Sequence, residues 1–182
     1  MAIFDYDRRR AYEYALRWAY RRNPLFTDFS ELGGDCTAFV SQCIFAGCCR
    51  MNFTEDIGWY YISINDRAPA WSGVEFLYDF ITTNTGDGPF GSESDVMRLR
   101  TGDVIQLADE NGDWYHTLLV IGRDGGEVLV AAHTVDCFAR PLSTYSYTTL
   151  RGIRIEGYRS GSDTCDCFEG LINGTRLELC RN

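Results

Sequence analysis

The chain has 182 residues, of which 45% are apolar and 24% charged, and its formal net charge is −9. This length and composition predict one soluble globular domain with its own core. The negative charge argues against a nucleic-acid partner, because proteins that bind the phosphate backbone concentrate positive charge on one face. All 17 basic residues are arginines, which excludes Schiff-base chemistry on a lysine.

The N-terminal stretch "MAIFDYDRRR" reaches a charged residue at Asp5 and contains no apolar run of signal-peptide length. No stretch approaches the ~18 apolar residues that a membrane span requires. As written, the sequence predicts a cytoplasmic protein that does not interact with a membrane, with secretion as the alternative for the mature form of a precursor. The eight cysteines fit a reducing compartment if they are buried, catalytic or metal-bound, and an oxidising one if they pair. Their spacing does not decide between the two.

Helices are predicted in the first half of the chain. Residues 5–22 have apolar side chains at helical spacing and precede Asn23-Pro24, a helix-stop signal. Residues 35–48 show the same spacing, which predicts a second helix with one face in the core and Asp35 as its N-cap. Residues 52–100 are rich in aromatic residues, Gly, Asn and Asp, and we expect loops there around a short helix in "WSGVEFLYDFIT".

From residue 103 the apolar period changes to two. The segments "DVIQLA", "WYHTLLVIG", "EVLVAAHT" and "GIRIEGY" are predicted strands, and Asn111-Gly112 and residues 124–126 are hairpin signals between them. Helices followed by an antiparallel β-meander indicate an α+β fold. We expect a domain over residues 1–160 and a cysteine-containing C-terminal tail over 161–182.

The segment "GGDCTAFVSQCIFAGC" (residues 33–48) places Cys36 at the start of the second helix. The partial positive charge at a helix N-terminus lowers the pKa of a thiol, and the thiolate is the nucleophile. Gly33 and Gly34 leave room for a substrate carbonyl, and the Cys36 N–H is a candidate oxyanion donor. These features favour a nucleophile supported by Gly34 and Asp35. The alternative is a small core residue on the buried helix face.

The chain has two histidines, His116 and His133, and both fall in neighbouring predicted strands. A two-residue turn at Asp124-Gly125 would set them directly opposite each other, close enough for His133 to orient the ring of His116. A turn shifted by one residue would set Val135 against His116 and keep both histidines on one face. The alternative is that each is a half-exposed structural histidine.

The motif "GGDCTAFVSQCIFAG", followed by "WYY", "GDVIQL", "WYHTLLVI" and "VLVAAHT", resembles the bacterial putative amidase domain, a relative of the NlpC/P60 peptidases with a papain-like fold. The resemblance covers roughly residues 6–158. It implies a Cys-His amidohydrolase without a cofactor, with Cys36 as nucleophile, His116 as base and His133 as the orienting residue. Ala38 stands where the family usually carries Asn, and Ala46-Gly47-Cys48 replaces the commoner Ala-Gly-Gly.

The predicted reaction is hydrolysis of an amide or peptide bond through an acyl-cysteine intermediate, on a peptide or amide substrate. Cell-wall peptides are the natural substrate class within the resemblance. Trp59, Tyr60 and Trp114 are candidates for the walls of the substrate cleft, and ordinary packing is the alternative for each.

Two other functions stay open from the sequence. One is a zinc site made of Cys36, His116 and His133 with Asp136 or Cys137. The other is a non-catalytic binding module on the same fold. The sequence does not predict an oligomeric state.

Overall fold

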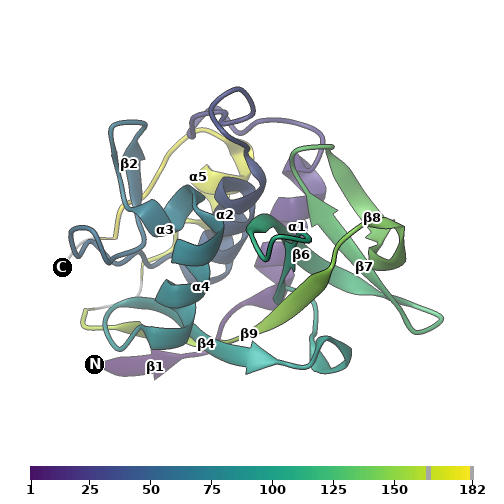
Figure 1. The fold of residues 1–182 in the computed structure, drawn as a ribbon. Coiled ribbons are helices and arrows are strands. Elements are labelled where there is room, and N and C mark those ends of the chain that lie inside the picture. The colour runs from purple at the N-terminus through teal and green to yellow at the C-terminus, as the bar shows by residue number, and fades with distance from the viewer. Residues whose placement is uncertain (163–164, 181–182) are drawn as a thin grey trace.

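The computed structural model describes residues 1–162 and 165–180, and its fold is α+β (Figure 1). An antiparallel sheet runs in the order β1-β9-β5-β6-β7-β8, and β4 pairs with β9 from Gly152 to Arg159. Its strands are β1 (Ala2–Phe4), β4 (Gly88–Ser94), β5 (Val104–Ala108), β6 (Trp114–Asp124), β7 (Glu127–Ala132), β8 (Cys137–Pro141) and β9 (Thr149–Ser160). A separate hairpin joins β2 (Tyr61–Ser63) and β3 (Asp66–Arg67). The helices are α1 (Arg8–Trp18), α2 (Cys36–Cys48), α3 (Pro69–Ser72), α4 (Val74–Thr83) and α5 (Phe168–Asn173).

The first predicted helix is shorter than expected. Asp7 caps α1 by accepting a hydrogen bond from the Arg10 backbone N–H at 3.0 Å. The helix ends at Trp18, before the predicted stop at Asn23-Pro24, and the Trp18 carbonyl accepts bonds from the Arg21 backbone N–H and the His133 ring.

No helix among residues 1–162 and 165–180 has the length and apolar character needed to cross a membrane.

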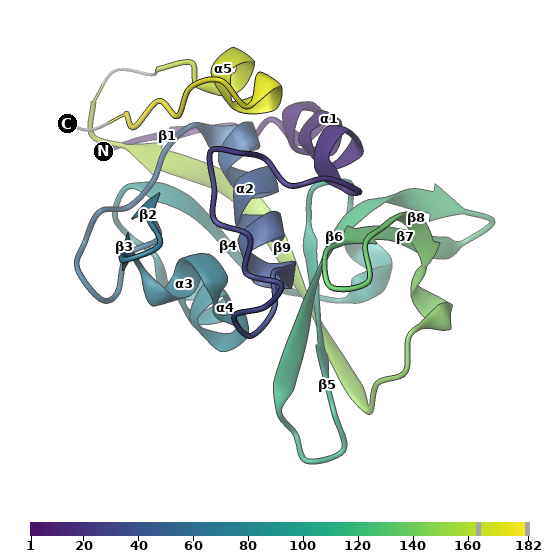
Figure 2. The same ribbon diagram turned by 90° about the horizontal axis from the view of Figure 1, so that it is seen from above.

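The second predicted helix is confirmed, and it is more deeply buried than one apolar face would imply. Every residue of α2 is buried. Figure 2 shows α2 between α1 on one side and α3 and α4 on the other, and α2 also contacts β6. A helix enclosed in this way is apolar around most of its circumference. Its N-terminus therefore has a fixed position against the sheet.

The predicted strands around residues 104–108, 114–122, 127–132 and 152–158 are confirmed, whereas β1, β4 and β8 were not predicted. The segment of β4, "GPFGSES", lacks the alternation of apolar and polar residues that marks a half-buried strand. The predicted helix over residues 71–82 is divided between α3 and α4 at Gly73, which has an extended conformation.

The hairpin between β6 and β7 closes with the pair Asp124–Glu127 and contains a bulge. The register shifts between Val120 and Gly122, so that Leu119 pairs with Ala131 farther along the ladder. One extra residue in a strand moves all later side chains to the opposite face relative to the partner strand. This bulge decides where the two histidines point.

The described part of the C-terminal tail packs against the helices. A disulfide joins Cys49, at the C-terminal end of α2, to Cys167, and a second disulfide joins Cys165 to Cys180. The Leu171 carbonyl in α5 accepts a bond from the Asn23 amide at 2.9 Å. The free cysteines among residues 1–162 and 165–180 are Cys36, Cys43, Cys48 and Cys137, and all are buried.

Candidate active site

Cys36 lies at the first position of α2, at the bottom of a cavity of about 280 Å³ that we call the Cys36 cavity. The cavity is also lined by Gly33 and Gly34, by residues 115–116 of β6, by residues 134–135 between β7 and β8, and by Arg140, Tyr145 and Ser146. Gly33 and Gly34 have φ angles of +105° and +114°, a region that other residues rarely adopt. The chain can therefore turn sharply into α2 with no side chain above the thiol.

Asp35 occupies the predicted N-cap position but does not cap the helix with its side chain. Its carboxylate accepts a bond from the Phe29 backbone N–H at 3.1 Å and pairs with Arg22 Nε at 3.0 Å. It also meets His133 Nδ1 at 2.5 Å. Its own N–H donates to the hydroxyl of Thr134 at 3.2 Å. Asp35 thus ties the start of α2 to the segment after α1 and to the loop that follows β7.

The Cys36 thiol is 6% exposed, and its burial raises its pKa above the ordinary value. Hydrogen bonds from the backbone of Thr117 and from Thr37 oppose this effect. The direction of this pKa shift is opposite to the one expected from the helix start, and loss of hydration is its largest cause. A raised pKa favours the neutral thiol at pH 7.

His116 lies on β6, paired with Leu107 of β5, and lines the Cys36 cavity as predicted. Its ring centroid is 5.7 Å from that of Tyr145, and it also contacts Tyr115. Burial, and secondarily the positive charge of Arg140, lowers the His116 pKa to about 4. At neutral pH the ring is uncharged, so it has a nitrogen that can accept a proton. No ring nitrogen of His116 is hydrogen-bonded to a residue in the described ranges.

His133 does not meet His116, and the predicted contact between the two rings is wrong. His133 Nδ1 bonds Asp35 at 2.5 Å, and Nε2 bonds the Trp18 carbonyl at 3.0 Å. The ring stacks on Phe39 with 4.0 Å between centroids. Because of the bulge in β6, the observed register extended past Ala131 would place Thr117, and not His116, opposite His133. His133 follows the end of β7, and its ring is bonded to Asp35 and Trp18, whereas His116 lines the Cys36 cavity.

A buried polar network, which the sequence did not reveal, connects Cys36 to the far side of β6. The hydroxyls of Thr37 and Thr117 are 2.8 Å apart, and Gln106 donates to the Thr117 hydroxyl at 3.4 Å. Arg151 Nε donates to Gln106 Oε1 at 2.8 Å. The network fixes β6 against the first turn of α2, and so fixes His116 relative to Cys36.

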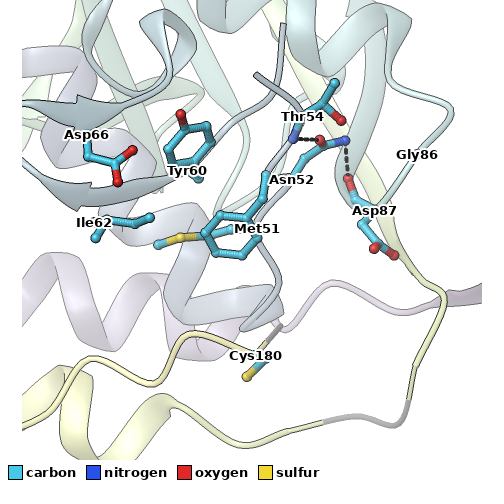
Figure 3. A pocket seen from close by; sticks show the side chains of 10 residues that line it. Met51, Asn52, Thr54, Tyr60, Ile62, Asp66, Gly86, Asp87 and Cys180 are labelled. Carbon is cyan, nitrogen blue, oxygen red and sulfur yellow. Dashed lines mark hydrogen bonds between the residues drawn. The ribbon is translucent and has the colours of Figure 1, made fainter. Parts of the chain in front are cut away.

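The aromatic residues proposed as cleft walls do not line the Cys36 cavity. Trp59 is fully buried in the core, where its ring N–H donates to Ser41 at 3.0 Å. Trp114 lies under the Arg151 guanidinium, 3.9 Å from its ring centroid. Tyr60 lines a different cavity of about 600 Å³ beside the β2–β3 hairpin, where Figure 3 shows it next to Asp66. Tyr115 and Tyr145 take the place of these residues at Cys36.

The residues of the alternative zinc site are directed to other partners. His133 bonds Asp35, Asp136 forms a two-point ion pair with Arg22, and Cys137 lies 3.3 Å from the Tyr145 hydroxyl. Across the described ranges, no group of three His, Cys, Asp or Glu side chains is arranged to hold a metal ion. Cys36 and His116 both line this cavity and are therefore the candidate reactive pair.

Comparison with known proteins identifies a relative and a family of this chain. A stretch of 137 residues is 30% identical to the uncharacterized protein YhbB of Bacillus subtilis (strain 168), which covers 73% of this chain and 43% of that protein. The chain thus spans less than half the length of this curated relative. No solved structure shows a significant match. The family described as "Putative amidase domain" matches residues 5–155, which include Cys36 and His116, and the chain belongs to this family.

Proposed function

We propose that the chain is a cysteine amidohydrolase that cleaves an amide or peptide bond through an acyl-cysteine intermediate. The observation that carries this proposal is that a thiol at a helix N-terminus and an uncharged imidazole line one cavity. Membership of an amidase family supports hydrolysis of an amide. A helix-borne cysteine packed against an antiparallel sheet that supplies the histidine also supports a papain-like arrangement related to NlpC/P60 peptidases.

The reaction would begin with both groups neutral. As the Cys36 sulfur attacks the substrate carbonyl, His116 takes the thiol proton, and a C–S bond forms. The backbone N–H of Cys36 is a candidate donor to the oxyanion, because N–H groups in the first turn have no partner within the helix. His116 then returns the proton to the leaving nitrogen, and the C–N bond breaks. A water activated by His116 hydrolyses the thioester and releases a carboxylic acid.

Cell-wall peptides are the substrate class that we propose within this family. The two disulfides support action in an oxidising compartment, because glutathione and thioredoxin keep most cytosolic thiols reduced. This proposal replaces the cytoplasmic location expected from the N-terminal sequence.

Cys36 should be the first thiol to react with iodoacetamide near pH 7 in the unreduced protein. It lines a cavity, whereas Cys43 and Cys48 are enclosed in the core, where burial raises the Cys48 pKa to about 12. Mass spectrometry after limited labelling would identify the modified peptide. Labelling of Cys43 or Cys48 before Cys36 would contradict the assignment of the nucleophile. The four disulfide cysteines should react only after reduction, which checks the oxidised state in the same samples.

The activity should depend on pH through His116 alone over most of the acid range. Because the uncharged ring is the base, kcat/KM should rise as the pH passes about 4 and stay level through neutrality. A thiolate–imidazolium pair would instead lose activity when the histidine deprotonates at higher pH. The measurement is a profile of kcat/KM on a substrate obtained from a screen of peptidyl and simple amides. A fall in activity between pH 7 and 8 would contradict the neutral resting pair.

A further inference from the structure

The Cys36 cavity has an unusual charge for a protein with a net charge of −9. Among the residues that the structure describes, its lining contains no aspartate or glutamate, and Arg140 is the one charged side chain there because His116 is neutral. The Asp35 carboxylate behind Cys36 is paired with Arg22 and with His133. The N-terminal end of α2 adds further partial positive charge. The cavity therefore favours an anion.

Arg140 is held in place, but no carboxylate neutralises it. Its Nε donates to the Thr144 hydroxyl at 2.8 Å and its Nη2 to the Thr144 carbonyl at 3.1 Å. The guanidinium carbon lies 3.9 Å from the ring centroid of Tyr145. Within residues 1–162 and 165–180, no acidic side chain forms an ion pair with it. Asp136, which is close to Arg140 in the sequence, instead forms an ion pair with Arg22, with N–O distances of 2.9 and 3.0 Å.

We propose that Arg140 binds a free carboxylate of the substrate and so determines specificity at this site. The inference rests on the proposed hydrolysis at Cys36 and names its substrate class: amides with a carboxylate near the scissile bond, such as peptides cleaved next to a free carboxyl group. The planar guanidinium of an arginine can donate two parallel hydrogen bonds to one carboxylate, and these bonds are charge-assisted. Burial is the main cause of the lowered His116 pKa, and the positive charge of Arg140 adds to it, so Arg140 influences the base as well as the bound substrate.

The test compares two reagents of similar size at Cys36, anionic iodoacetate and neutral iodoacetamide. The measured quantity is the rate of alkylation by iodoacetate divided by the rate with iodoacetamide, normalised to the same ratio for free cysteine in the same buffer. We expect this ratio to fall about 10-fold in Arg140→Gln relative to the wild type. The fall in this ratio should be smaller in Arg140→Lys, because lysine keeps the positive charge but lacks the planar guanidinium. Arg123→Gln is the matched control, since Arg123 also lies on the sheet but binds the Val96 carbonyl outside the cavity. An unchanged ratio in Arg140→Gln would overturn the proposal.

A second measurement separates this inference from the proposed function. Calorimetric titration with N-acetylglycine and with N-acetylglycinamide needs no reactive thiol. Binding of the acid to the wild type, with loss in Arg140→Gln and little binding of the amide, would support Arg140 even if Cys36 proved unreactive to both alkylating reagents. Unreactive Cys36 would count against the hydrolase, whereas equal binding of acid and amide would count against Arg140.

Discussion

Replacement of Cys36 by alanine should reduce amide hydrolysis at least ~10³-fold, to the level that binding and oxyanion stabilisation alone can support. The side chain supplies the atom that forms the covalent bond, and no other free thiol lines the Cys36 cavity. Substrate affinity should change little, because the thiol is small and contributes little to the surface of the cavity. The measurement is kcat and KM of both proteins on a substrate found in the amide screen.

Cys43→Ala is the matched control for this loss. Cys43 lies on the same helix, is a free thiol and is fully buried in the core. Its substitution should cost about 1 kcal/mol of stability through a small void and leave kcat within a few-fold of the wild type. Urea unfolding of all three proteins would show that they fold. Hydrolysis by a folded Cys36→Ala protein at the wild-type rate would rule out the cysteine mechanism.

The sequence predicted those parts of the site that depend on local pattern. Cys36 at a helix start follows from Gly33, Gly34 and the apolar spacing after them. His116 on a buried strand follows from the alternation in "WYHTLLVI". That both line one cavity was expected from the family resemblance, and the packing of α2 on β6 provides it.

The parts that depend on a single inserted residue or on long-range contacts could not be predicted. Both hairpin registers predicted from the sequence kept His116 and His133 on one face, and neither included the bulge near Ile121, which shifts the register by one residue. No local pattern reveals that a bulge is present. Arg140 lies on β8, an unpredicted strand, and its position beside His116 depends on how the sheet curls. Trp59 is of a residue type that often lines binding sites, but tertiary packing places it in the core.

Replacement of His133 by alanine should lower the free energy of unfolding by about 3 kcal/mol, because it removes the partner of a buried carboxylate. His133 and Asp35 are each 1% exposed, and Asp35 directly precedes the nucleophile. The substitution also leaves a void against Phe39 and removes one of the two hydrogen bonds to the Trp18 carbonyl. Arg22→Gln is the comparison: Arg22 binds the same carboxylate from a partly exposed position, so we expect a loss of about 1 kcal/mol. Both values come from urea unfolding.

Two further variants, His133→Gln and Asp35→Asn, distinguish a positioning role of His133 from membership of a catalytic triad. If His133 acts by holding Asp35 and the start of α2, His133→Gln should lower kcat while the acid inflection of kcat/KM stays near pH 4, because His116 keeps its burial and its neighbour Arg140. A residue that hydrogen-bonded His116 would move that inflection when replaced. A double-mutant cycle with Asp35→Asn should show coupling between positions 35 and 133 of more than about 1 kcal/mol. Additive losses in this cycle, or an acid inflection displaced by one pH unit, would contradict the positioning role and support His133 as a member of a catalytic triad.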